Sequence, residues 1–114
     1  MMLEVLNLEQ ALGFLGGEKD LLAELLKAFV NSRPFAEETL IQLEKENKLE
    51  AAKYIHYYKG AARQIGAERL AQTGQALEDE LRGRTETDLD LLTQSFLTTY
   101  SEALAAVKNA LEIL

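Results

Sequence analysis

His56 is the only histidine in the chain, and it stands in the stretch HYYKGAARQIGA, shortly before Lys59 and Gly60. If this stretch is helical, residues three and four apart share a face, so Lys53, Lys59 and Arg63 lie with His56 on the side away from the core. An imidazole is largely neutral near pH 7, and neighbouring cations disfavour a further positive charge on it. A neutral ring nitrogen can accept a phosphoryl group covalently, while cations stabilise the negative charge that arrives. These residue types therefore predict nucleophilic attack by His56 on phosphorus.

Gly60 is unusual for the interior of a predicted helix. A glycine there costs about 1 kcal/mol of helix propensity relative to alanine. Side chains lean toward the N-terminus of their helix, so a side chain at position 60 would cover the surface beside His56. Gly60 leaves that surface bare. We therefore predict an imidazole that faces solvent, among cations and beside an open patch that can admit a bulky partner.

The composition excludes several other kinds of chemistry. Because the chain has no cysteine, it can form no disulfide, thiolate metal site or cysteine nucleophile. A single histidine cannot supply the repeated Glu-x-x-His motifs of di-iron helical bundles. No glycine-rich loop of the Walker or protein-kinase kind is visible. We expect no bound metal or cofactor, no ATP site and no self-sufficient enzyme.

Length and charge predict one domain over residues 1–114. The net charge of −7 argues against binding to nucleic acid or to an anionic membrane surface, since both require a positive field. The N-terminal stretch lacks the basic head of a signal peptide, and no apolar run reaches the roughly 20 residues of a membrane span. We expect a cytoplasmic protein.

The hydrophobic pattern is helical almost throughout, which predicts an all-α fold. Asn7 and Gln10 form a capping box for a short first helix that ends at Gly16-Gly17. Asp20 is a plausible N-cap for the next helix. Pro34 interrupts that segment, so two short helices or one kinked helix are both possible. Because apolar residues seven apart continue through the proline (Leu22, Phe29, Ala36 and Leu43), the kinked single helix is favoured.

Three further helices follow. Asn47 and Glu50 form a second capping box, for a helix that runs to about Ile65, and Gly66 is a natural left-handed C-cap. Another helix starts near Ala67, and a last one runs from the loop RGRTETD nearly to the C-terminus. Short connections imply antiparallel neighbours. The expected fold is an antiparallel up-down-up-down four-helix bundle with a short extra N-terminal helix.

Apolar spacing indicates which residues face the core of this bundle. On the helix that carries His56, these are Ala51, Tyr54 or Ile55, Tyr58, Ala62 and Ile65. The segment before it contributes Leu22, Leu26, Phe29, Ala36, Leu40 and Leu43. The two helices after it contribute Leu70, Gly74, Leu77, Leu81, Leu92, Phe96, Tyr100, Ala103, Val107, Ala110 and Leu114.

The antiparallel neighbour of the His56 helix offers candidates for orienting the ring. Counting equal distances from the turn at Gly66 brings residues near position 76 opposite His56, so Gln75, Glu78 or Asp79 could reach it. A carboxylate there could accept a hydrogen bond from one ring nitrogen and leave the other free to attack. Glu78 is the preferred candidate; the alternative is an ordinary surface carboxylate.

The stretch HYYKGAARQIGA resembles the signature of histidine-containing phosphotransfer (HPt) domains, H-x-x-K-G followed after five residues by G-A. LGG followed by LLAELLKAF is similar to the N-terminal part of such domains, and the resemblance covers most of the chain, more loosely in the last helix. It implies that His56 is the phosphorylated residue and that Lys59 assists by stabilising phosphate charge. It also implies that Gly60 admits the receiver domain and that Gly66 closes the helix.

HPt domains relay phosphoryl groups between the aspartates of receiver domains, so the resemblance implies receiver domains of a hybrid sensor kinase and of a response regulator as partners. Gly60, Arg63, Lys53 and Tyr57 are the expected partner-binding residues. Mg²⁺ is expected on the receiver, and the protein is expected to act as a monomer. It is either a free-standing HPt protein or a module of a larger kinase. A non-catalytic helical bundle that docks on a signalling partner is the alternative.

The sequence departs from the HPt pattern at two positions. Tyr58 stands where family members commonly have leucine, and Ala61 where they often have a small hydroxyl residue. Tyr58 on the inner side implies a differently packed core near the site. Neither change removes a group that the chemistry requires.

Overall fold

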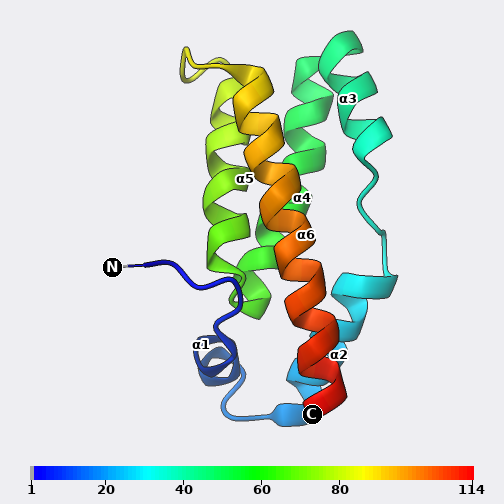
Figure 1. Cartoon of the computed structure of the whole chain (residues 1–114), viewed down its shortest axis with the longest axis vertical. Helices are drawn as coiled ribbons and strands as arrows, with labels where there is room; N and C mark the ends of the chain where they lie inside the picture. Colours follow the sequence, from blue (N-terminus) through cyan, green and yellow to red (C-terminus); the bar gives the residue numbers. More distant parts are fainter. Residues whose placement is uncertain (1) are drawn as a thin grey trace.

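The structure, a computed structural model, describes residues 2–114, and all of its regular elements in that range are helices (Figure 1). In chain order they are α1 (Leu8–Phe14), α2 (Lys19–Asn31), α3 (Glu37–Glu46), α4 (Lys48–Ile65), α5 (Glu68–Leu81) and α6 (Leu89–Ile113). The predicted all-α class is confirmed. Within the described range, no helix is both long enough and apolar enough to cross a bilayer.

The three long C-terminal helices run along one another, and α5 packs against both α4 and α6. Helices α4 and α5 run in opposite directions on either side of the turn at Gly66, and α6 reverses direction again (Figure 1). Helix α2 packs against α4 and α6, and α3 packs against α4. In Figure 1, α2 and α3 lie one below the other along the bundle, joined by an extended linker of residues 32–36.

The prediction of a single kinked helix through Pro34 is wrong, because residues 32–36 are not helical and separate α2 from α3. Residue Ser32 already has extended angles (φ −92°, ψ 123°) and so does Ala36 (φ −122°, ψ 118°). A residue that precedes proline is pushed out of the helical region, which favours a break. The seven-residue apolar spacing was misleading because Ala36, which it assigned to the core, is exposed and stands at the N-cap of α3.

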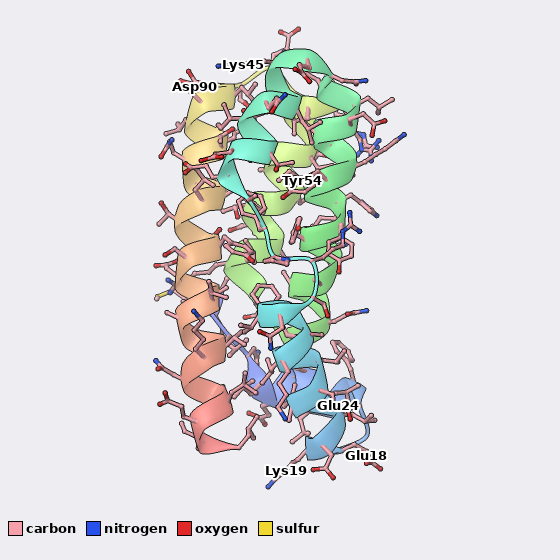
Figure 2. All side chains as sticks on the ribbon, turned by 90° about the vertical axis from the view of Figure 1, so that its right-hand side faces the viewer. Glu18, Lys19, Glu24, Lys45, Tyr54 and Asp90 are labelled. Atoms are coloured by element: carbon pink, nitrogen blue, oxygen red, sulfur yellow. The ribbon has the colours of Figure 1, made fainter. Side chains whose placement is uncertain are left out.

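Tyrosine hydroxyls from two distant helices stabilise the linker. The backbone N–H of Ala36 donates to the Tyr54 hydroxyl at 2.9 Å, and that of Phe35 to the Tyr100 hydroxyl at 3.4 Å. The Tyr58 hydroxyl donates to the carbonyl of Arg33 at 2.8 Å. The Phe35 ring packs among aromatic rings of α4 and α6, with its centroid 4.9 Å from that of Tyr100. Figure 2 shows the linker crossing this aromatic region, with Tyr54 labelled. These tertiary bonds satisfy backbone groups that a helix would satisfy locally.

Most of the predicted helix ends are found. The Asn7 side chain accepts from the Gln10 N–H at 3.0 Å, and the Asn47 side chain from the Glu50 N–H at 3.2 Å. Gly66 ends α4 in the left-handed region at φ 77°. There the carbon that any other side chain requires would collide with the backbone of Asn7.

The predicted N-cap at Asp20 is wrong. Helix α2 begins at Lys19, and the N-cap position belongs to Glu18, which makes no side-chain capping bond. Asp20 lies in the first turn instead. A negative charge there is still favourable, because the first turn of a helix carries the positive end of its dipole.

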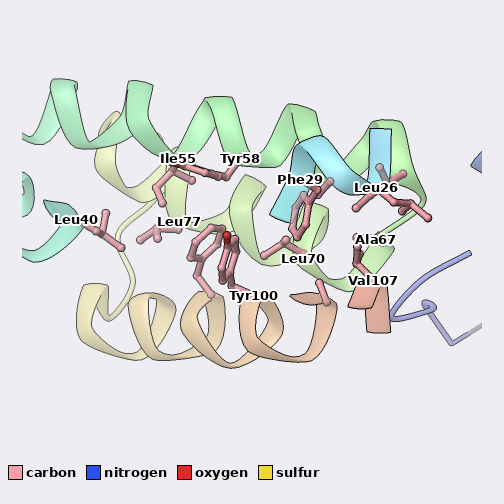
Figure 3. Packing of buried hydrophobic residues seen from close by; sticks show 14 of the residues in the cluster. Leu26, Phe29, Leu40, Ile55, Tyr58, Ala67, Leu70, Leu77, Tyr100 and Val107 are labelled. Carbon is pink, nitrogen blue, oxygen red and sulfur yellow. The ribbon is translucent and has the colours of Figure 1, made fainter. Parts of the chain in front are cut away.

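The core contains most of the predicted inner-face residues (Figure 3). Ile55 is fully buried whereas Tyr54 is only partly buried, which decides the alternative left open for α4. Leu114, assigned to the core by its spacing, is half exposed at the end of α6. The predicted residues that are buried are Leu22, Leu26, Phe29, Leu40, Ala51, Ile55, Tyr58, Ala62, Ile65, Leu70, Gly74, Leu77, Leu81, Phe96, Tyr100, Ala103, Val107 and Ala110.

Candidate functional site

His56 lies near the middle of α4 with 61% of its side chain exposed. The preceding residue, Ile55, is fully buried in the core. Successive helical residues point about 100° apart around the axis, so packing of Ile55 turns His56 outward. The imidazole therefore faces solvent, as the spacing predicted, and is held on a rigid element.

The surface next to the ring is open. A carbon atom added at Gly60 in the position of a side chain would meet nothing within 4 Å. Packing inside the chain therefore does not require glycine at this position. The unfavourable helix propensity of Gly60 has no compensation within the chain, which is consistent with a surface kept free for another molecule.

A buried carboxylate approaches the ring from the neighbouring helix. Glu78, on α5, is 3% exposed, and its two carboxylate oxygens lie 3.1 and 3.2 Å from Nδ1 of His56. The same carboxylate lies 2.7 Å from Nζ of Lys59 and accepts from Nε of Arg82 at 2.8 Å. One acidic group therefore contacts three basic groups.

The charge state of Glu78 follows from two opposing effects. Burial raises the pKa of its carboxyl group, but the hydrogen bonds from Lys59, Arg82 and His56 together outweigh that effect and hold the pKa at about 2. The group is therefore ionised at neutral pH. An ionised carboxylate only accepts hydrogen bonds, so it favours the tautomer of His56 with hydrogen on Nδ1 and leaves Nε2 with a free lone pair.

Lys59 is not the exposed cation that the helical spacing predicted. Its side chain is only 7% exposed, and its ammonium group contacts Glu78 and donates to Oε1 of Gln75 at 3.0 Å. The structural reason lies on α5, where Gly74 provides the space for the lysine stem. A side-chain carbon added at Gly74 would lie 3.2 Å from Cβ of Lys59.

The imidazole is therefore not surrounded by free cations. Its nearest charged neighbour is the carboxylate of Glu78, and the lysine three residues along the helix is turned toward the same carboxylate. The positive charge of Lys59 is present at the site, but it lies beneath the exposed surface.

The other predicted residues occupy different positions around this cluster. Gln75 makes no hydrogen bond to the ring; its Oε1 accepts from Lys59 and from Arg63 at 3.2 Å, and its Nε2 donates to Asp79 at 2.9 Å. Asp79 also accepts from Arg84, so neither Gln75 nor Asp79 takes the position that Glu78 holds.

Lys53 and Tyr57 lie on the exposed part of α4. Lys53 pairs with Glu50 at 3.3 Å, and both side chains are more than half exposed, so this pair contributes little to stability. Tyr57 is 38% exposed, and the guanidinium carbon of Arg33 lies 4.1 Å from the centre of its ring.

Three residues of this region were missed by the sequence reasoning. Arg82 could have been found, because it stands four residues after Glu78 and therefore on the same helix face. Gly74 was assigned to the inner face, but its effect on Lys59 depends on the distance between two helices. Nothing in the sequence pattern indicated that Arg33 belongs to this region, since its position depends on the linker that replaces the predicted kinked helix.

No cluster of three or more histidine or acidic side chains suited to a metal ion occurs among residues 2–114. A family model described as Hpt domain matches residues 4–112 of the chain. No curated protein and no solved structure matches it significantly.

Proposed function

The chain belongs to the Hpt domain family, whose members transfer phosphoryl groups in two-component signalling, and we propose that it is a phosphorelay intermediate. His56 accepts a phosphoryl group from the aspartyl phosphate of one receiver domain and passes it to the aspartate of another. The observation that carries the proposal is the exposed His56 ring with Nδ1 at 3.1 Å from the buried, ionised Glu78. This arrangement leaves Nε2 as the nucleophile.

In the transfer step, the lone pair of Nε2 forms a bond to phosphorus. The bond between phosphorus and the aspartate oxygen breaks, and its electron pair leaves with the aspartate carboxylate. The proton on Nδ1 stays there, hydrogen-bonded to Glu78, whose negative charge compensates the positive charge that develops on the ring. The same step in reverse delivers the phosphoryl group to the second receiver.

Lys59 stabilises phosphate charge through its field rather than by a free ammonium group. Its Nζ lies 2.7 Å from Glu78, so its charge and that of Arg82 more than offset the carboxylate. Without them, a negative group under the ring would repel the incoming phosphoryl group. Their positive charge keeps the site favourable to an anion while Glu78 still orients the imidazole.

The receiver domain supplies the groups that activate the phosphoryl donor, which this chain does not provide. It contributes the acidic pocket and the Mg²⁺ that activate its own aspartyl phosphate, so no ATP site is needed here. Gly60, Arg63, Lys53 and Tyr57 form the docking surface. The protein acts as a cytoplasmic monomer that engages neither nucleic acid nor membrane.

We propose further that the fold is the antiparallel up-down-up-down four-helix bundle expected of HPt domains. Helices α2 and α3 together occupy one position, and α4, α5 and α6 occupy the other three. The reversal of direction between α4, α5 and α6 (Figure 1) supports this interpretation.

The decisive experiment is transfer from a receiver domain that has been charged with radiolabelled acetyl phosphate and Mg²⁺. We expect acid-labile, base-stable label on the wild-type chain and none on a His56→Gln variant. A Lys108→Gln variant, altered at an exposed position of α6, serves as the control and should be labelled normally. Label on the His56→Gln chain would assign the acceptor to another residue. Binding of the receiver without any label on the wild type would favour the non-catalytic interaction module.

A further inference from the structure

Arg33 has an unusual backbone conformation. Its φ is 52°, and it is the only residue other than glycine with a positive φ in the described part of the chain. Such a conformation is sterically unfavourable for a residue with a Cβ atom, and glycine would adopt it freely. Strain of this kind persists where surrounding contacts impose it and is concentrated at functional sites. The surroundings of Arg33 are therefore informative.

Two consecutive tyrosines of α4 hold this residue. The Tyr58 hydroxyl donates to the Arg33 carbonyl at 2.8 Å, and the Arg33 guanidinium lies over the Tyr57 ring, 4.1 Å from its centre. Tyr57 directly follows His56 in the sequence. The strained linker therefore places a guanidinium group on an exposed aromatic ring beside the exposed imidazole.

The charge of Arg33 is not compensated within the described chain. Of the five arginines, Arg69, Arg82 and Arg84 contact the carboxylates of Glu102, Glu78 and Asp79. Among residues 2–114, Arg33 and Arg63 make no ion pair, and Arg63 bonds only to the amide oxygen of Gln75. Arg33 lies over the ring of Tyr57, the residue that follows His56, and Arg63 lies on the His56 face of α4, seven residues further along. In a chain with a net charge of −7, the side that carries the imidazole keeps two guanidinium groups available to an outside carboxylate.

A small hollow adjoins the Arg33–Tyr57 pair. It has a volume of about 70 Å³ and lies between α2 and α4, with Tyr57, Tyr58 and Ala61 on one side and Leu25, Phe29 and Ser32 on the other. Its lining is mainly apolar, so a partner residue next to the one that binds Arg33 meets an apolar surface.

We propose that Arg33, stacked on Tyr57, is a specificity-determining residue that binds a carboxylate on the surface of the docked receiver domain. This inference rests on the proposed function. The side chains of His56 and Tyr57 diverge by about 100° around the helix axis, so Arg33 lies to the side of the phosphoryl path. It therefore recognises the receiver and not the group in transfer. Charge complementarity of this kind sets partner choice and association rate.

The test compares two ways of phosphorylating the protein. Phosphoramidate, a small donor, reaches His56 without docking, whereas transfer from a charged receiver domain requires it. The variant Arg33→Gly relieves the strain and so should fold at least as stably as the wild type. We expect its receiver-dependent kcat/KM to fall about tenfold relative to its rate with phosphoramidate, mainly through KM. The salt dependence of receiver-dependent transfer should also become weaker.

Two further variants make the outcome specific. Lys108→Gln removes one positive charge from α6 and should leave KM for the receiver unchanged. Arg33→Lys keeps the charge but not the planar fork, so it should restore part of the lost affinity. An unchanged KM and salt dependence in Arg33→Gly would overturn this inference alone. Failure of phosphoramidate and of every charged receiver to label the wild-type chain would overturn the proposed function, and this inference with it.

Discussion

The carboxylate of Glu78 lies 3.1 Å from Nδ1 of His56, although the two residues are 22 positions apart in the chain. The turn at Gly66 sets this register, because it reverses the chain between α4 and α5. Gly66 is itself fixed by the N-terminal segment, since the N–H of Asn7 donates to its carbonyl at 2.7 Å. The orientation of the imidazole therefore depends on a backbone contact at the end of the bundle.

Glu78→Gln removes the charge at nearly constant shape and tests the orienting role. Lys59 and Arg82 would then lack their carboxylate partner, so we expect a loss of about 3 kcal/mol in the free energy of unfolding. We also expect slower phosphorylation of His56, by about tenfold or more, because a neutral amide fixes the tautomer less firmly. Urea unfolding and nitrogen NMR of the imidazole measure the two effects. The matched control is Asp79→Asn on the same helix; an unchanged tautomer and rate in Glu78→Gln would remove Glu78 from the mechanism.

The depressed pKa of Glu78 predicts acid sensitivity of the fold. The pKa of this carboxyl is about 2 in the folded chain, against 4.5 for an unperturbed glutamate side chain, so the unfolded state binds a proton more readily. The stabilisation is fully present above pH 5 and is lost as the pH falls toward 2. It amounts to about 3 kcal/mol at one pKa unit per 1.4 kcal/mol. Urea titrations at a series of pH values should show a steeper loss in the wild type than in Glu78→Gln. An equal loss of stability with falling pH in the two proteins would contradict a depressed pKa of Glu78.

Gly60→Ala should separate stability from function. The added methyl group meets nothing within 4 Å, and alanine is the better helix former, so the free energy of unfolding should rise by about 0.5–1 kcal/mol. Transfer from a charged receiver should nevertheless slow, because the methyl group occupies the surface beside His56. Thermal unfolding and transfer kinetics on the same sample measure the expected gain in stability and the expected loss of transfer rate. A more stable protein with normal transfer would show that the patch is not used for docking.

Gly74→Ala also replaces a helical glycine by alanine, but we expect it to lower the free energy of unfolding, whereas Gly60→Ala should raise it. The added carbon would lie 3.2 Å from Cβ of Lys59, closer than ordinary contact, and that atom is not the end of a flexible chain; the ring of Phe96, at 3.5 Å, would be in ordinary contact. Displacing the Lys59 stem by a few tenths of an ångström should cost about 1 kcal/mol or more, which exceeds the gain in helix propensity. Lys59 should also lose its close contact with Glu78. Urea unfolding compared with Gly60→Ala provides the measurement, and equal stabilisation by both substitutions would show that Lys59 does not need this space.

The sequence by itself determined the features that depend on local contacts. The Asn7 and Asn47 caps bond to residues three positions ahead, and the left-handed turn at Gly66 reflects what glycine can adopt without strain. The outward direction of His56 follows from the spacing of Ala51, Ile55 and Ala62 on α4, because buried residues at that spacing define the opposite face.

Only the tertiary structure decided the features that depend on contacts between distant segments. The linker at residues 32–36 forms because hydroxyls of Tyr54 and Tyr100 replace helical hydrogen bonds. Lys59 turns inward because Gly74, on another helix, leaves room for its stem and Glu78 binds its charge. The spacing of residues along one helix specifies a direction, but not what the neighbouring helix offers in that direction.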